Sequence, residues 1–339
     1  MKLRRLLALF LFFGLAFCAG YVTLRPYRGF SGEAFVDIRR GASTLEIASD
    51  LASAGVVRSE WPFLLLRLIH PRSVLKAGEY RFDRPVSPLA VYHKILAGDV
   101  FYFAVTIPEG YNMFDIAETV SRTGVISREA FLAEARRGER IAAFAQGAPT
   151  LEGFLFPDTY RLTRHSTAEQ LVGQMLRRFR DVFLELQGAA PSATRNVLEV
   201  VTLASLVEKE TAVPSERPLA ASVFRNRLRL GMPLQCDPTV IYALQIAGRY
   251  GGQIHKEDLA LVSPYNTYAR AGLPPGPIAN PGRASLAAAL SPAQTDYLYF
   301  VADGQGGHIF SKTFDSHSKA VASYVRGARR RASENGKPQ

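Results

Sequence analysis

The sequence predicts an α+β fold that is mainly helical and follows a single N-terminal transmembrane helix. Three features predict it: an apolar run near the N-terminus, a strand–turn–helix unit that occurs twice, and a long apolar helix followed by loops and a β-hairpin. The chain has 339 residues, of which 47% are hydrophobic and 11% aromatic, so its length suggests about two domains with buried cores.

Apolar residues fill positions 6–24 almost without interruption. At 1.5 Å per residue such a helix spans roughly 28 Å, close to the thickness of the hydrocarbon core of a bilayer. Lys2, Arg4 and Arg5 precede the run without an acidic residue, which places the N-terminal end in the cytosol. Everything after about Arg25 is then exported.

A cleaved signal peptide is the alternative, because it also combines a basic start with an apolar stretch. No Ala-x-Ala site followed by a polar start occurs near Ala19, and the bulky Phe17 is a poor neighbour for lipid modification of Cys18. We therefore expect residues 1–28 to form a cytosolic stub and a retained anchor in the cytoplasmic (inner) membrane. The rest of the chain would be periplasmic or otherwise extracytoplasmic.

The net charge of +11 predicts attraction to anionic partners, such as phospholipid headgroups, acidic wall polymers or nucleic acid. Export argues against nucleic acid, and no aromatic-studded basic strand accompanies the arginines within 177–180 and 329–331. Cys18 and Cys236 lie far apart, so no disulfide is expected, and the six histidines match no metal-binding pattern. We expect neither a metal nor another cofactor.

A short strand, a glycine turn and an amphipathic helix occur in this order twice. Residues 36–57 align with residues 105–126 at an offset of about 69, and residues 80–96 align with residues 160–176 at an offset of about 80. The longer second offset indicates an insertion in the second copy. Strand, helix, helix and strand in so small a unit resemble LysM-type modules, which bind N-acetylglucosamine polymers.

On this basis residues 29–100 are expected to form one LysM-like module, and the first part of residues 101–326 to repeat it. The insertion contains residues 151–158, in which Glu152 lies among aromatic side chains that look exposed, and Glu152 is therefore a candidate for binding substrate. The alternative is that both copies only pack and hold the rest of the chain away from the membrane.

One segment combines an apolar helix with acidic residues at its end. Ser192 can cap a helix that continues to about Thr211 and is apolar on nearly every side, so it must be buried. Its last turn holds Glu208 and Glu210, and Pro214 follows. A carboxylate at the negative end of a helix dipole and beside apolar surface has a raised pKa, as a general acid near neutral pH needs.

Glu208 and Glu210 are two positions apart and would point about 200° away from each other, so only one of them can face a given cleft. The residues alone leave two interpretations open. Either one glutamate is a catalyst, or both are solvated charges or partners of arginines such as Arg217.

Seven stretches in a fixed order resemble the YceG-like family, the endolytic murein transglycosylases also called MltG. These stretches are Ala-Ser-Leu-Val-Glu-Lys-Glu-Thr at 204–211, Ser-Glu-Arg at 215–217, Val-Phe-Arg-Asn-Arg-Leu at 223–228, Leu-Gln-Cys-Asp-Pro-Thr-Val-Ile-Tyr at 234–242, Ser-Pro-Tyr-Asn-Thr-Tyr at 263–268, Gly-Leu-Pro-Pro-Gly-Pro-Ile-Ala at 272–279 and Tyr-Leu-Tyr-Phe-Val-Ala-Asp-Gly at 297–304. The resemblance covers nearly the whole chain and implies a catalytic domain over residues 101–326.

The reaction implied by the resemblance is that of a lyase, a peptidoglycan lytic transglycosylase. It cleaves the β-1,4 bond between N-acetylmuramic acid and N-acetylglucosamine in nascent glycan strands and leaves a 1,6-anhydro end. The second glutamate of the family's Glu-Lys-Glu-Thr string is catalytic, which carries over to Glu210 and leaves Glu208 a supporting role at most. One carboxylate suffices, because the C6 hydroxyl of the sugar is an intramolecular nucleophile with a high effective concentration.

Four further residues are candidates for binding the glycan. Gln235 and Thr239 flank a predicted helix start and could face a sugar, with a role in capping as the alternative. Tyr265 and Asn266 lie in a loop rich in proline and glycine, where aromatic faces stack on sugar rings and amides pair with N-acetyl groups. Packing within the loop is the alternative for this second pair.

The C-terminal part is expected to hold a helix that starts with Asp237 as cap and Pro238 at the first position. A β-hairpin over residues 297–310, a last helix near residues 317–326 and a polar tail over residues 327–339 would follow. Cys236 departs from the threonine or other small polar residue that the family often has there, which puts any hydrogen bond from that position in doubt.

The resemblance also implies penicillin-binding synthases as partners at the site of wall synthesis. Two rival functions remain: a non-catalytic peptidoglycan-binding scaffold, in which Glu210 is incidental, and a hydrolase that acts on the same glycan.

Overall fold

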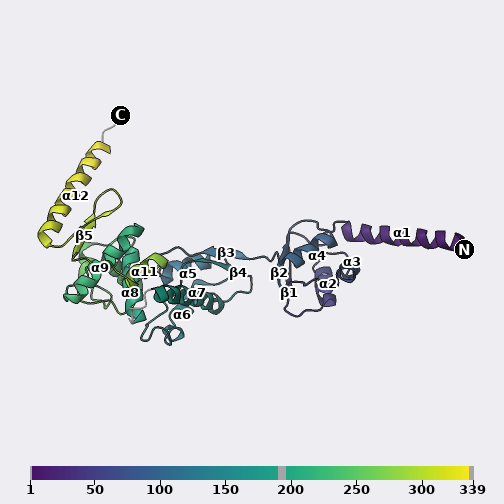
Figure 1. Cartoon of the computed structure of the whole chain (residues 1–339), viewed down its shortest axis with the longest axis horizontal. Coiled ribbons are helices and arrows are strands. Elements are labelled where there is room, and N and C mark those ends of the chain that lie inside the picture. The colour runs from purple at the N-terminus through teal and green to yellow at the C-terminus, as the bar shows by residue number, and fades with distance from the viewer. Residues whose placement is uncertain (1, 190–195, 336–339) are drawn as a thin grey trace. The chain divides into compact units, whose positions relative to one another are not determined.

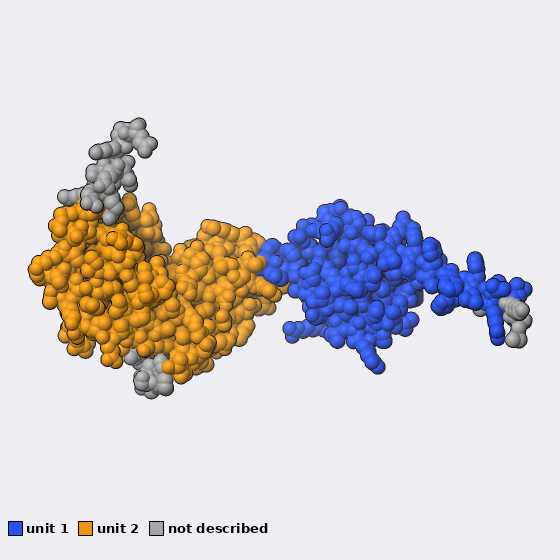
Figure 2. Space-filling model, turned by 45° about the horizontal axis from the view of Figure 1, so that its top comes forward, with its two compact units in different colours: residues 1–103 blue, residues 104–339 orange. Residues whose placement is uncertain are grey.

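The computed structural model describes residues 2–189 and 196–335 and divides the chain into two compact units, residues 1–103 and 104–339 (Figure 1 and Figure 2). Helices and strands both occur and helices predominate, so the fold is α+β and mainly helical, as the sequence predicts.

The first unit begins with helix α1 (Lys2–Leu24), whose segment Leu3–Leu24 is long and apolar enough to cross a membrane. Its large apolar side chains are exposed in the structure, among them Phe10 and Phe17.

Five further elements of the first unit enclose one core. They are β1 (Ala34–Ile38), α2 (Thr44–Ser53), α3 (Trp61–Ile69), β2 (Gly78–Phe82) and α4 (Pro88–Ala97). Strand β1 pairs antiparallel with β2, with Val36 opposite Tyr80, and both side chains are buried together with Phe63. Ser43 caps α2 through a capping box with Glu46, so the helix starts directly after the glycine turn.

The second unit opens with the same order of elements. It has β3 (Phe103–Thr106), α5 (Met113–Ser121), α6 (Arg128–Ala135), β4 (Thr159–Leu162) and α7 (Ala168–Ala189), and β3 pairs with β4. Gly41 and Gly110, which the sequence alignment superposes, both have the left-handed backbone, with φ of 81° and 77°. The order of elements therefore agrees with the repeat read from the sequence.

The insertion ahead of β4 is buried, and the expectation of exposed aromatic side chains there is wrong. Phe154 is fully buried and packs edge to face against Phe179 of α7, with ring centroids 5.1 Å apart. The backbone amide of Leu155 donates to Oδ1 of Asn280 at 2.9 Å. The insertion is thus an internal part of the second unit.

The second half of this unit is a group of helices followed by a hairpin. Its elements are α8 (Val197–Glu210), η2 (Pro214–Glu216), α9 (Arg217–Arg229), α10 (Asp237–Ile246), η3 (Lys256–Ala260), α11 (Arg283–Leu290), β5 (Tyr299–Ala302), β6 (His308–Ser311) and α12 (Phe314–Asn335). Helix α8 contacts α9, α10 and α11, and Figure 1 shows α8, α9 and α11 together near β5. All side chains from Val200 to Val207 are buried, as expected for an apolar helix.

The hairpin is confirmed: β5 and β6 pair antiparallel, and the carboxylate of Asp303 accepts hydrogen bonds from the amides of Gln305 and Gly307 in the turn. The last helix is longer than predicted, because α12 continues to Asn335 through residues that were expected to form a polar tail. Arginine and alanine, which dominate that stretch, are good helix formers.

Candidate active site

Helix α8 carries the predicted acid at its C-terminal end. The helix begins at Val197, where Asn196 caps it, whereas the predicted cap Ser192 lies outside the described residues. It ends at Glu210, because Thr211 adopts an extended backbone conformation. The Glu210 side chain is thereby brought from the interior to a partly exposed position.

Glu208 is held by the protein itself. Its carboxylate accepts a hydrogen bond from Nη2 of Arg217 at 3.1 Å and another from the backbone amide of Gly282 at 3.0 Å. The side chains of Glu208 and Arg217 are only 6% and 9% exposed, so this is a buried ion pair, and Glu109 lies 3.7 Å from the same guanidinium. The interpretation of Glu208 as an arginine partner is therefore confirmed.

Glu210 lines a pocket of about 320 Å³, which we call the Glu210 pocket. The other residues that line it are Val223, Phe224, Arg227, Leu234, Gln235, Asp237, Tyr268, Phe300 and His317. These residues come from α9, from α10 and the segment ahead of it, from the 263–268 loop, from β5 and from α12. The pocket therefore combines a carboxyl group with polar side chains from several elements.

Burial raises the pKa of the Glu210 carboxyl above its ordinary value, and the negative charge of Asp237 raises it further. A hydrogen bond from the Cys236 thiol and the nearby charges of His308 and Arg227 act in the opposite direction. The side chain at position 236 therefore does reach the acid, although as a thiol it is a weak donor. A carboxyl group with a raised pKa can hold a proton closer to neutral pH, as a general acid must.

Asp237 is a second carboxylate in the Glu210 pocket. It is the first residue of α10, and Cys236 occupies the cap position without a side-chain hydrogen bond, so the prediction that Asp237 caps this helix is wrong. Instead, Oδ1 of Asp237 accepts a short hydrogen bond of 2.5 Å from the hydroxyl of Tyr268. This bond and burial raise the pKa of Tyr268, so the phenol stays protonated as the donor.

Gln235 has a strained backbone that places its side chain at the pocket. Its φ is 52°, and among the described residues Gln235 alone has a positive φ without being a glycine. Such a conformation costs about 1 kcal/mol or more. The neighbours Leu234 and Cys236 are both buried, and the amide of Gln235 donates to the carbonyl of Thr267 at 3.2 Å. The exposed Gln235 side chain thus lies at the pocket between two buried neighbours.

Arg227 fixes the opposite wall. Its guanidinium donates to the carbonyl oxygens of Leu298 at 2.7 Å and Leu234 at 2.8 Å, and it lies 5.1 Å from the ring centroid of Tyr299. These bonds join α9 to the segment before β5 and to the segment before α10. They also hold a positive charge close enough to Glu210 to affect its pKa.

Thr239 and Asn266 do not reach the pocket, and both are fully buried. Oγ1 of Thr239 donates to the carbonyl of Cys236 at 2.7 Å, and Nδ2 of Asn266 donates to the carbonyls of Leu259 and Leu261 at 3.0 and 2.8 Å. In this structure neither side chain is exposed, so the structure does not bring them to the pocket surface. They hold the loops around the site in place.

Glu152 is also buried, at the start of helix α5. Its carboxylate accepts hydrogen bonds from the amide of Met113 at 2.9 Å, from the hydroxyl of Tyr242 at 2.9 Å and from Nδ2 of Asn280 at 2.7 Å. Burial nevertheless raises the pKa of Glu152 to about 8. This residue joins α5, α10 and the 280 loop inside the unit, and the structure does not place it at the Glu210 pocket.

Tyr265 is half-buried and does not line the Glu210 pocket. Its ring packs edge to face on Tyr242, with centroids 5.1 Å apart, and burial raises the pKa of its hydroxyl to about 12. Of the five residues expected to bind substrate, the structure thus places Gln235 beside Glu210.

Sequence reasoning missed Arg227, Asp237 and Tyr268 as parts of the site. Each belongs to a motif noted in the sequence, but the motif alone does not tell which of its side chains turns inward. The hydrogen bond between Tyr268 and Asp237 joins residues 31 positions apart, beyond the reach of spacing arguments. Across residues 2–189 and 196–335 no three His, Cys, Asp or Glu side chains gather as a metal site would require.

Comparison with known proteins gives concordant matches. The model of the YceG-like family matches residues 36–323. A Bacillus subtilis protein named endolytic murein transglycosylase is 34% identical over 332 residues, which are 93% of this chain and 91% of that protein. A Streptococcus pneumoniae protein of the same name is 32% identical over 322 residues, 86% of this chain and 58% of that longer protein. A crystal structure of a YceG-like protein from Listeria monocytogenes, 31% identical, superposes with a TM-score of 0.58 over 86% of this chain and 99% of that one.

Proposed function

The chain belongs to the YceG-like family, and we propose that it is an endolytic murein transglycosylase, a lyase that cuts the glycan strands of peptidoglycan with Glu210 as the catalytic acid and base. One observation carries the assignment of the acid: Glu210 leaves a buried helix at the wall of a polar pocket, where burial and Asp237 raise its pKa. The buried pair of Glu208 with Arg217 supports Glu210 rather than Glu208 in this role.

In the proposed reaction, protonated Glu210 gives its proton to the glycosidic oxygen between N-acetylmuramic acid and N-acetylglucosamine, and the bond from C1 to that oxygen breaks. The Glu210 carboxylate then takes the proton of the C6 hydroxyl as the C6 oxygen bonds to C1, which forms the 1,6-anhydro ring. The acid is thereby returned to its starting state. The nucleophile belongs to the substrate, so no water and no second protein nucleophile are required.

Two pocket residues suit the positive charge and the N-acetyl groups of such a substrate. The Asp237 carboxylate, oriented by Tyr268, can stabilise positive charge that develops at C1. The Gln235 amide can pair with an N-acetyl group, since it offers both donors and an acceptor. Thr239, Asn266 and Tyr265 would act indirectly, by holding the loops that carry these side chains.

The remaining parts of the chain support the same function. Helix α1 would anchor the protein in the cytoplasmic membrane, with the basic N-terminal end in the cytosol and both units outside. Residues 29–100 would form a LysM-like module that holds glycan, which is supported by their strand, helix, helix and strand order. Residues 101–326 would form the catalytic domain, and the family resemblance supports nascent strands as substrate and penicillin-binding synthases as partners.

Hydrolysis is the second candidate reaction. Asp237 places a second carboxylate in the pocket, and ordinary glycosidases use two carboxylates. Mass spectrometry of the fragments that the full chain in detergent releases from murein sacculi separates the possibilities. The proposed lyase yields anhydro ends, whereas a hydrolase yields reducing ends heavier by one water. A scaffold releases no more fragments than the Glu210→Gln variant does.

A further inference from the structure

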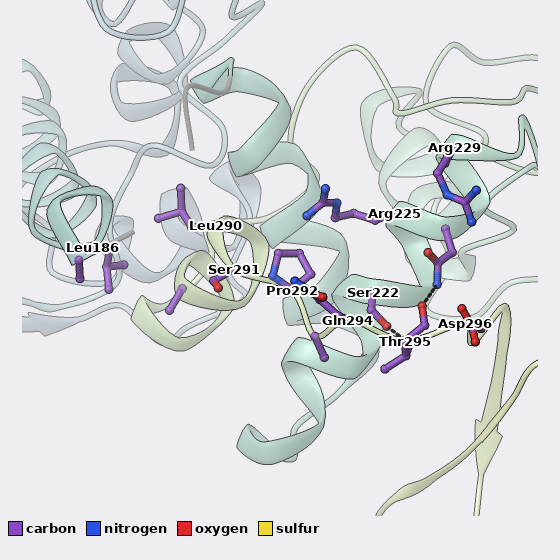
Figure 3. A pocket seen from close by; sticks show the side chains of 14 residues that line it. Leu186, Ser222, Arg225, Arg229, Leu290, Ser291, Pro292, Gln294, Thr295 and Asp296 are labelled. Atoms are coloured by element: carbon purple, nitrogen blue, oxygen red, sulfur yellow. Dashed lines mark hydrogen bonds between the residues drawn. The ribbon is translucent and has the colours of Figure 1, made fainter. Parts of the chain in front are cut away.

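A second cavity, of about 1100 Å³, is lined in part by helix α9, and Figure 3 shows its lining side chains. Its lining from α9 consists of Ser222, Arg225, Asn226 and Arg229, and the end of α7, the end of α11 and the segment 291–296 also line it. Successive helix residues turn by about 100°, so these four side chains point roughly 150° away from those of α9 that line the Glu210 pocket. One helix therefore separates the two cavities, and we call the second one the α9 cavity.

Hydrogen bonds hold the wall of the α9 cavity in place. The hydroxyls of Ser222 and Thr295 are 2.6 Å apart, as Figure 3 shows, and Nδ2 of Asn226 donates to the carbonyls of Thr295 at 2.8 Å and Tyr297 at 3.0 Å. The segment that leads into β5 is thus fixed against α9. Binding of a ligand would therefore cost little conformational entropy in this part of the wall.

Two arginines of the wall are exposed and have no polar partner among the described residues. Arg225 and Arg229 are exposed, lie one helical turn apart and make no hydrogen bond or ion pair with any residue that the structure describes. Asp296 also lines the cavity, but its carboxylate pairs with Lys312 at 3.0 Å. Like charges at this spacing destabilise a helix, and the helix dipole favours only Arg229, which lies in the last turn. The pair is therefore left for an anion from outside the protein.

An arginine side chain suits a carboxylate, because its guanidinium group can donate two parallel hydrogen bonds to it. Murein strands carry such groups on the peptide stems of their N-acetylmuramic acid residues. A helix with its side chains is about 10–12 Å across, so the path half-way around it is roughly 16–19 Å, and an extended pentapeptide spans up to about 17 Å. A stem on a sugar at Glu210 would thus have to be fully extended to pass around α9.

We propose that the α9 cavity binds a peptide-stem carboxylate of the murein strand whose glycan bond lies at Glu210, through Arg225 and Arg229. The inference rests on the proposed function and adds to it a requirement for peptide stems. Under this proposal Arg225 and Arg229 help to determine which strands are cut, although they lie away from the glycosidic bond that breaks.

The test compares two substrates with the full chain in detergent: glycan strands with intact peptide stems, and strands stripped of stems by an amidase. For the Arg225→Gln/Arg229→Gln variant, the preference for stem-bearing over stripped strands should fall about tenfold, as expected when a charge-assisted pair is removed. The fall should lie mainly in KM, because the contact is remote from the reacting atoms. The control Arg128→Gln/Arg249→Gln removes two exposed, unpaired charges elsewhere and should keep the wild-type preference.

The outcomes separate this inference from the proposed function. An unchanged preference in the Arg225→Gln/Arg229→Gln variant would overturn the cavity assignment while leaving the lyase intact, provided that the wild type releases anhydro products. An equal loss on both substrates would overturn it too, because the arginines would then attract the strand without reading its stems. Failure of the wild type to cut either substrate would instead contradict the proposed function.

Discussion

Glu208 and Glu210 are two residues apart at the end of α8, and their carboxyl groups lie in different surroundings. Glu208 accepts hydrogen bonds from Arg217 and from the amide of Gly282. Glu210 lines a pocket together with Asp237 and receives no ion pair of its own among the described residues. One carboxylate is thus bound within the protein, and the other faces a pocket.

Glu208→Gln tests the structural half of this division. The substitution removes the negative charge that the buried Arg217 faces, with only Glu109 at 3.7 Å to compensate. We expect the free energy of unfolding to fall by about 1–3 kcal/mol and the thermal midpoint of the second unit, followed by near-UV circular dichroism, to fall by several degrees. Glu199→Gln changes an exposed acid of the same helix and should stay within about 0.5 kcal/mol of the wild type. Equal midpoints for both variants would mean that the buried pair contributes no stability.

Asp237→Asn should alter the pH dependence of the reaction. Glu210 must be protonated to act as the acid, so the rate falls as the pH rises through its pKa. Because the charge of Asp237 raises that pKa, its removal lowers the pKa and should move the alkaline limb of the profile to lower pH. Initial rates of anhydro-product release over about pH 5–9 give the limb. Asp181→Asn, at an exposed acid on α7, serves as control, and a limb that stays in place in Asp237→Asn would contradict the account.

Cys236→Ala should move the same limb the other way. The thiol of Cys236 donates to the Glu210 carboxyl and lowers its pKa, so its loss raises the pKa and extends activity to higher pH. The alanine variant leaves only a small space, because the thiol is small and 1% exposed. A shift of the Cys236→Ala limb in the same direction as that of Asp237→Asn would show that the thiol does not act through Glu210.

Glu152 should make the stability of the second unit depend on pH. Its pKa is raised to about 8 in the fold, whereas a carboxyl group in the unfolded chain titrates near about 4.3, so the folded state binds more protons between these values. The contribution of Glu152 to the free energy of unfolding is then fully present below the pKa of the unfolded chain. It declines as the pH rises toward the pKa of the folded state, by up to about 1.4 kcal/mol per pH unit. Relative to Glu152→Gln, which does not titrate, the wild type should lose stability across this window in urea titrations. Parallel curves would mean that the three donors keep Glu152 ionised in the fold.

Elements with a regular pattern could be predicted from the sequence. The apolar run near the N-terminus, the buried helix that ends at Glu210 and the hairpin at Asp303 all follow from periodicity or turn chemistry, and the structure contains each of them. The resemblance to the YceG-like family came from motifs that the family model also matches.

The interior polar contacts could not be predicted. Glu152, Thr239 and Asn266 look exposed in the sequence because they lie among turn residues, yet each is buried. Their burial is stabilised by hydrogen bonds to distant parts of the chain, such as the one from Asn280 to Glu152, and no local pattern reports these. For the same reason the sequence does not predict the hydrogen bond between Tyr268 and Asp237 in the Glu210 pocket.

The role of Glu210 as the catalytic acid is tested most directly by the rate at which purified glycan strands gain 1,6-anhydro ends. The full chain, Glu210→Gln and Glu208→Gln are compared in detergent after circular dichroism has established the folded fraction of each. The account predicts that Glu210→Gln loses about 10²–10⁴-fold in rate per folded molecule, whereas Glu208→Gln stays within a few-fold of the wild type. A Glu210→Gln protein that forms anhydro ends at the wild-type rate would contradict it.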